Sequence, residues 1–223
     1  MKERPIPFLP AMVRAVLDGT KTQTRRLVKP QPKGAVFFDG QWLDHGHGEA
    51  GDTALHCPYG VAGDRLWVRE PWRVGKPHDK KPPRDLWPRA DGRGITVLYE
   101  AGGWRDMGGR QTYPDDLAMP PFAGKYRPSM FMLRAFSRIT LEVTGVRVER
   151  LQDISAEDCI AEGIECFATV GGNAWRDYSG GSGFSVRDQH STRSSFRSLW
   201  TSTGGEWDAN SWVWVVEFKR VDS

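Results

Sequence analysis

The first hydrophobic pattern along the chain has the spacing of a helix. Apolar residues recur three and four positions apart between residues 9 and 18, with Pro10 at the start and Gly19 just after the end. Proline suits the first helical turn, and glycine suits the residue that follows a helix. The pattern therefore predicts one amphipathic helix over residues 9–18. Its apolar stripe consists of Leu9, Met12, Val13, Val16 and Leu17.

Alternating apolar and polar positions predict the main strands. The alternation is clear from Leu66 to Val68, from 137 to 150, and from 211 to 221, with a further strand expected at 95–101. A short helix is predicted between the strands at 137–150 and 211–221, with Ser155 as its N-cap and Gly163 after its last turn. A second helical pattern follows at 191–202. Few helices and several separated strands favour an α+β fold.

Glycine, proline and polar residues dominate the rest of the chain. We expect insertions at about 30–60, 73–128 and 165–190, the first with one short hairpin and the last as a mobile loop. The second contains only one strand pattern and little apolar periodicity, so we predict that it borders the pocket and does not form a domain. The expectation is a single domain over 1–223 that carries these insertions.

Composition narrows the class of protein. The 223 residues are 39% hydrophobic, which supports a folded core, and 31 basic against 28 acidic residues do not by themselves indicate a nucleic-acid partner. Three cysteines without a CxxC pair favour a reducing compartment. The prolines near the N-terminus do not fit a signal peptide, and no apolar run is long enough to span a membrane. We expect a monomeric cytoplasmic protein that does not bind membranes.

The stretch LDGTKTQTRR, residues 17–26, raises the question whether it forms a functional site or only a solvated loop. A lysine, three threonines and two arginines follow the predicted helix directly. One interpretation is a solvated loop in which Lys21 is a cation at a helix C-terminus, where the helix dipole favours positive charge. The other is a site in which Lys21 and Thr24 take part in chemistry and the arginines hold a polar or anionic ligand.

Four segments in order resemble the ASCH domain family, a branch of the PUA-like superfamily. Gly19, Lys21 and Arg26 resemble its GxKxxxxR signature, and the long members of tailed phages and prophages resemble this chain most in detail. The other segments are GDRLWVRE (63–70), SAEDCIAEGI (155–164) and WVWVVEFKRV (212–221). The resemblance implies a PUA-like β-barrel with short flanking helices, within the α+β class. The segments 30–60 and 73–128 have no counterpart in the compact members.

Family members differ in activity, and the residues here resemble one group of them. In the N4-acetylcytidine amidohydrolases a lysine, a threonine three residues later and a glutamate on the downstream helix act together. The matching residues are Lys21, Thr24 and Glu162. A lysine with a lowered pKa would activate the threonine hydroxyl, and the glutamate would orient the lysine or carry a proton to the leaving amine. The alternatives are a non-catalytic module that binds RNA or a modified base, and a ribonuclease.

The expected pocket accepts a modified nucleoside or an RNA base, with nucleic acid as an alternative partner. Its wall would include Arg25, Arg26, Arg69 and Glu70. Residues three apart in a regular strand point to opposite faces, so Lys21 and Thr24 meet only if the chain turns after the helix. We expect their side chains to lie within hydrogen-bond reach, directly or through one water.

Two further groups of residues give weaker indications of function. His45, His47, His56 and Cys57 match no closed zinc pattern, so we expect no metal and no cofactor. A lysine- and arginine-rich stretch around Trp87, at residues 76–89, has the composition of a surface that tracks a nucleic-acid backbone, although a solvated, partly mobile loop is the preferred interpretation.

Overall fold

The structure is a computed structural model that describes residues 1–46, 51–86, 94–107, 112–114, 118–169, 172–180 and 191–221. The chain divides into two compact units, each built from separate stretches of sequence. The first unit comprises Met1–Lys2, Ala15–Arg65 and Glu142–Arg220, and the second comprises Glu3–Arg14, Leu66–Leu141 and Val221–Ser223. Whether the chain is the single domain expected from its sequence stays a prediction.

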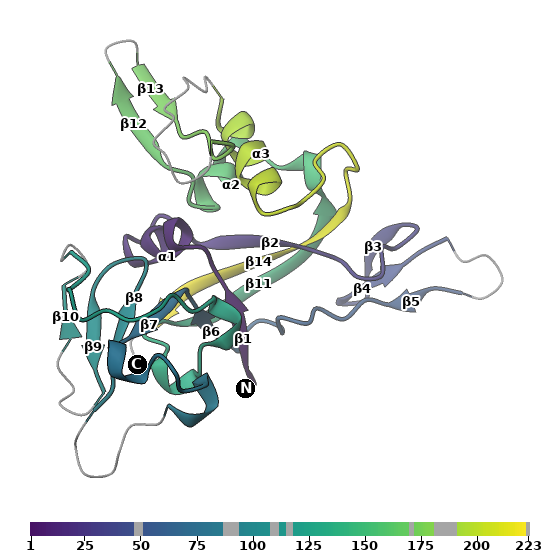
Figure 1. Cartoon of the computed structure of the whole chain (residues 1–223). Coiled ribbons are helices and arrows are strands. Elements are labelled where there is room, and N and C mark those ends of the chain that lie inside the picture. The colour runs from purple at the N-terminus through teal and green to yellow at the C-terminus, as the bar shows by residue number, and fades with distance from the viewer. Residues whose placement is uncertain are drawn as a thin grey trace. The chain divides into compact units, whose positions relative to one another are not determined.

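The largest sheet has five strands in the order β1-β6-β11-β14-β2 (Figure 1). Its strands are β1 (Glu3–Pro7), β2 (Gln23–Leu27), β6 (Arg65–Arg69), β11 (Thr140–Arg150) and β14 (Trp212–Val221). In the described part of the chain β1 and β2 are the outer strands, and no pairing between them closes the sheet. The α+β class predicted from the sequence is confirmed, and the sheet is open.

The antiparallel pair β2–β14 sets the orientation of the residues of interest. Thr24 lies opposite Val216, and the Phe218 amide donates to the Thr22 carbonyl at 2.8 Å. Successive residues of a strand point their amides and carbonyls to opposite sides, so Thr22 and Thr24 bond to β14. The backbone groups of Gln23 and Arg25 consequently point to the outer edge of the sheet.

Three helices accompany these strands, and the patterns that predicted them are confirmed. They are α1 (Pro10–Leu17), α2 (Ala156–Ala161) and α3 (Thr192–Ser202). The Ser155 hydroxyl accepts a hydrogen bond from the Asp158 amide at 3.0 Å, which is the N-cap predicted for α2. Helix α2 packs against α3, whose buried residues include Phe196 and Leu199 (Figure 1).

Two small sheets belong to the first unit, and the hairpin expected within 30–60 is β3 (Ala35–Phe38) paired with β4 (Gln41–Asp44). Strand β5 (Thr53–Ala54) completes this three-stranded sheet, and the other sheet is β12 (Cys166–Thr169) with β13 (Gly172–Trp175). The loop predicted from residue 165 onward was therefore wrong for residues 166–169 and 172–175, because backbone pairing from Cys166–Trp175 to Thr169–Gly172 makes a regular ladder there. Residues 181–190 lie outside the described residues.

The second unit contains a four-stranded sheet in the order β10-β9-β8-β7. The strands are β7 (Trp72–Val74), β8 (Thr96–Tyr99), β9 (Trp104–Asp106) and β10 (Thr112–Tyr113). Only β8 was predicted, since the other strands have two or three residues and give no periodic signal. Short 3-10 turns, Lys76–His78, Pro83–Asp85, Ser129–Phe131 and Arg134–Phe136, connect to it.

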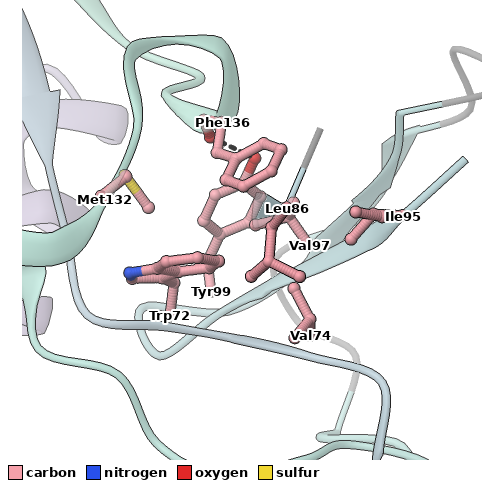
Figure 2. Close-up of a cluster of buried hydrophobic side chains, with 8 residues drawn as sticks. All are labelled: Trp72, Val74, Leu86, Ile95, Val97, Tyr99, Met132 and Phe136. Carbon is pink, nitrogen blue, oxygen red and sulfur yellow. Dashed lines mark hydrogen bonds between the residues drawn. The ribbon is translucent and has the colours of Figure 1, made fainter. Parts of the chain in front are cut away.

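A hydrophobic cluster stabilises this second unit (Figure 2). Trp72 and Phe136 pack with ring centroids 5.3 Å apart, and the Tyr99 hydroxyl donates to the Phe136 carbonyl at 2.9 Å. The other members are Val74, Leu86, Ile95, Val97 and Met132. The segment 73–128 therefore contributes several core residues, more than its sparse apolar pattern predicted.

Candidate functional site

The end of α2 and the start of β2 are joined by hydrogen bonds to the last carbonyls of the helix. The Thr22 amide donates to the Ala161 carbonyl at 2.9 Å, and the Gln23 side chain donates to the Asp158 carbonyl at 3.0 Å. The Lys21 ammonium donates to the Glu162 carbonyl at 2.7 Å. The last carbonyls of a helix lack amide partners further along it, and the start of β2 supplies partners for those of Ala161 and Glu162. The Asp158 carbonyl also accepts from the Glu162 amide at 2.9 Å. Lys21 thus places its ammonium at the C-terminal end of α2.

Lys21 and Glu162 form a buried ion pair inside the first unit. The Lys21 Nζ atom lies 2.9 Å from Glu162 Oε2, and the two side chains are 1% and 4% exposed. The same ammonium donates to the Gln23 carbonyl at 2.8 Å. Residues 141 positions apart in sequence, which the ASCH resemblance paired, therefore meet in the fold.

Arg25 binds the other oxygen of the same carboxylate. Its Nη1 atom lies 3.2 Å from Glu162 Oε1, its Nε atom 2.9 Å from Glu149 Oε1, and its Nη2 atom 2.7 Å from Asp158 Oδ2. The Arg25 side chain is fully buried. Glu162 is therefore held between two cations, and Arg25 between three carboxylates.

Arg147 extends this network on β11. Its Nη2 atom lies 2.7 Å from Asp158 Oδ2 and its Nε atom 3.2 Å from Glu149 Oε2, and it also pairs with Glu217 of β14. Alternate residues of a strand share a face, which places Arg147 and Glu149 together. The network thus connects β2, β11, β14 and α2 by charge-assisted hydrogen bonds.

Burial lowers the pKa of Lys21 below its ordinary value of 10.5, although the Glu162 carboxylate opposes the shift. The charges of Arg26 and Arg25 lower it further. For Asp158, burial raises the pKa, but Arg25 and Arg147 outweigh burial and hold it below 3.8. A lysine whose charged form is destabilised is the type of group that serves as a base near neutral pH.

The position of Thr24 is defined by β2. Its side chain is buried, and strand alternation places it on the face of β2 opposite to Gln23 and Arg25. Arg26 shares that face and is half-buried. Lys21 precedes the strand and bonds to the Gln23 carbonyl at its edge. The expected meeting of Lys21 and Thr24 side chains stays a prediction.

Two other residues expected in the pocket wall belong to the second unit. The Arg69 guanidinium lies 4.6 Å from the centre of the Trp67 ring, a cation–π arrangement. Glu70 is buried and makes a two-pronged salt bridge with Arg138, at 2.9 and 3.0 Å. Both residues thus have structural contacts within their own unit, and a role in binding substrate stays a prediction.

The histidine-rich segment contains a hydrogen-bonded pair of side chains. His45 Nδ1 lies 2.9 Å from Asp52 Oδ1, while His47 lies outside the described residues. Among the residues that the structure describes, no group of three or more His, Cys, Asp or Glu side chains is arranged to hold a metal ion. Within the same residues, none of the helices combines the length and the apolar character that crossing a bilayer requires.

Sequence reasoning missed Glu149 and Asp158 as members of the network. Asp158 precedes Glu162 by four positions, a spacing that places two side chains on one side of a helix. Glu149 follows Arg147 by two positions on a strand. Both spacings were visible, but only the fold shows that α2 and β11 turn these side chains toward Arg25.

Gly163 allows the close approach of α2 to Lys21. Its φ is +82°, and an added Cβ atom would lie 2.7 Å from Ala15 Cβ and 2.8 Å from Lys21 Cβ. We expect Gly163→Ala to lower the free energy of unfolding by roughly 2–4 kcal/mol, from left-handed strain and overpacking. Gly204→Ala is the matched control, because its φ is +85° and nothing lies within 4 Å of its added Cβ. Chemical denaturation of both variants measures the difference, and equal losses would contradict the packing argument.

No protein-family model matches the chain, and the searches of curated proteins and of solved structures gave no match either.

Proposed function

We propose that this chain is an ASCH protein of the PUA-like superfamily that hydrolyses N4-acylated cytidine or a related modified nucleoside. The observation that carries the proposal is the buried ion pair between Lys21 and Glu162. These residues are far apart in sequence, and they are two of the three that the resemblance assigns to the reaction. The third, Thr24, is buried on the strand that begins two residues after Lys21.

The pair offers a route to a neutral lysine. Both backbone carbonyls that Lys21 contacts can only accept hydrogen bonds, at 2.7 and 2.8 Å. A neutral Lys21 amine would keep both of these hydrogen bonds by donating its two hydrogens. It would accept a third hydrogen bond from the hydroxyl of a protonated Glu162. Transfer of one proton from Lys21 to Glu162 therefore creates an acid and a neutral amine that keeps both backbone contacts. The amine becomes a base for Thr24 when the Glu162 O–H turns from its lone pair toward N4 of the substrate.

In the proposed reaction the Thr24 hydroxyl attacks the carbonyl carbon of the amide as Lys21 takes its proton. The tetrahedral intermediate then collapses, the C–N4 bond breaks, and N4 of cytidine receives a proton from Glu162. Water hydrolyses the acyl-threonine, which releases the carboxylic acid and restores the hydroxyl. The Arg25 and Arg26 charges lower the pKa of Lys21 and so favour its neutral form.

A second candidate is a non-catalytic module that binds a modified base or RNA. The observation that favours it is that both oxygens of Glu162 and the ammonium of Lys21 already have protein partners. Such a network stabilises the fold without any reaction. The two candidates differ in one result, the release of acetate.

Purified protein incubated with N4-acetylcytidine should release cytidine and acetate, as followed by chromatography. Thr24→Ala should lower the rate by about 100-fold or more, because it removes the nucleophile. Thr22→Ala, an exposed threonine two positions earlier, is the control and should retain activity. Binding of the nucleoside without acetate would establish the second candidate, and wild-type activity in Thr24→Ala would contradict the mechanism.

A further inference from the structure

A lysine-rich segment of the second unit is fixed at both ends by the hydrophobic core. Lys76, Lys80 and Lys81 are exposed, and they lie between Val74 and Leu86. Both of these apolar side chains are fully buried members of the cluster in Figure 2. The turn Lys76–His78 and its neighbours are therefore held on a packed scaffold.

An aromatic segment runs alongside the lysines. Gly75 pairs with Ala123, the Lys76 amide donates to the Phe122 carbonyl at 3.0 Å, and the Lys125 amide donates to Asp79 Oδ1 at 2.8 Å. Gly124 permits this approach, since an added Cβ atom would lie 2.6 Å from the Val74 carbonyl oxygen. The two segments thus form one continuous surface.

Two aromatic rings are exposed on this surface. Phe122 is 46% exposed and Tyr126 is 51% exposed. The Arg73 guanidinium lies 5.8 Å from the centre of the Tyr126 ring and pairs with Glu100, which helps to fix the ring. Rigid exposed rings are suited to stacking on flat ligands.

The charge of the surface is positive. Four exposed lysines, at 76, 80, 81 and 125, face one half-buried carboxylate, Asp79, and one exposed one, Asp85, which has Arg84 beside it. The Arg127 guanidinium donates to the His78 and Lys81 carbonyls of the same segment, both at 3.0 Å. Among the described residues no carboxylate lies within ion-pair distance of Arg127, so its charge adds to that of the lysines.

We propose that this lysine–aromatic surface, comprising Lys76, Lys80, Lys81, Lys125, Phe122 and Tyr126, binds single-stranded nucleic acid. Lysines that follow the phosphates and aromatic rings that stack on unpaired bases are the two components that such binding requires. Acidic proteins and anionic membranes also carry negative charge, but they offer no row of exposed bases on which the aromatic rings could stack. The proposal does not rest on the amidohydrolase activity, because the surface shares no residue with the Lys21–Glu162 site.

The test is fluorescence anisotropy of the full chain with labelled oligouridylate and oligothymidylate of about 15 nucleotides, within the range of known site sizes. Both oligonucleotides are used because they share the phosphates and differ only in the sugar and in one methyl group of the base. Replacing the four lysines by glutamine should weaken binding at least tenfold. It should also reduce the slope of log K against log salt by about 3, since each phosphate contact on a single strand contributes about 0.7.

The aromatic rings are tested separately. Phe122→Ala and Tyr126→Ala should each raise the Kd between about 5-fold and 150-fold, the range expected for loss of one stacked base. Phe37→Ala is the matched control, an exposed phenylalanine of the first unit. The charge-matched control is glutamine at Lys2, Lys29, Lys33 and Lys219, which are exposed in that unit. Both controls should bind like the wild type.

Three results would overturn the proposal. They are absence of oligonucleotide binding by the wild type, equal weakening by the control substitutions, and unchanged binding by both aromatic variants. Heparin that binds as tightly as the oligonucleotide, with no effect of Phe122→Ala, would show attraction of any polyanion. Binding to vesicles of phosphatidylcholine and phosphatidylserine but not to oligonucleotides would assign the surface to membranes. Acetate release from N4-acetylcytidine is measured independently, so the failure of either proposal is recognised separately.

Discussion

Lys21→Arg should abolish the release of acetate from N4-acetylcytidine, with a loss of at least about 100-fold, while the folded state persists. Arginine keeps the positive charge beside Glu162, but it stays protonated in proteins and cannot accept the proton of Thr24. General bases contribute about 10²–10⁴-fold to rates, so the loss should be of that size. Nucleoside binding should change much less than turnover.

The wild-type pH profile supplies an independent readout of the same role. Burial lowers the pKa of Lys21, so its neutral form appears at a lower pH than for an ordinary lysine. The reacting form carries one proton on the Lys21–Glu162 pair, so the rate should fall as the pH rises through the lowered pKa of Lys21, with a midpoint below 10.5. Lys219→Arg is the control, because Lys219 is exposed and pairs with Glu142 at 3.0 Å. A Lys21→Arg variant that melts like the wild type and still releases acetate would eliminate the proposed base.

Arg25→Met should lower the free energy of unfolding at pH 7 by about 3–5 kcal/mol, the range for removing one partner of a buried ion pair. The Arg25 side chain is fully buried and contacts Glu149, Asp158 and Glu162. Without it, three carboxylates lie close together with only the lysine and Arg147 to balance them. Arg197→Met removes an exposed pair with Asp208 and should cost at most about 1 kcal/mol.

The loss caused by Arg25→Met should shrink as the pH falls. In the wild type Arg25 holds the pKa of Asp158 below its ordinary value, so this carboxylate stabilises the fold above the unfolded pKa of about 3.9. That stabilisation disappears as the pH falls through the lowered folded pKa. In the variant the crowded carboxylates protonate more readily. Urea unfolding at pH 7 and at about pH 2 compares the two, and an equal loss at both values would indicate packing and not charge.

The strongest sequence patterns predicted the backbone of this fold well. Helix α1, strands β6, β11 and β14, and the Ser155-capped α2 all follow from apolar spacing and capping residues. These elements are long enough, or have strong enough caps, for local preferences to agree with the tertiary structure. The strands β9 and β12 could not be predicted in this way, because pairing with a neighbour and not their own composition makes them regular.

The candidate site was predicted in part for a related reason. Lys21 and Glu162 were selected through their resemblance to a family motif, and their ion pair agrees with it. Arg25 was expected to bind substrate, yet its guanidinium contacts three carboxylates that come from β11 and α2. No spacing within residues 17–26 indicates those partners, since they lie more than 120 positions away along the chain.

The hydrogen bond from Lys21 to the Gln23 carbonyl also affects how the molecule meets other copies of itself. An outer strand with unoccupied backbone groups is a template on which another chain can add a strand, a common start of aggregation. At the outer edge of β2 the Lys21 ammonium donates a hydrogen bond to one of these outward carbonyls. The Gln23 side chain donates to a carbonyl of α2. An incoming strand would have to displace a buried charge from its carboxylate. The same lysine therefore discourages edge-to-edge self-association at this border of an open sheet.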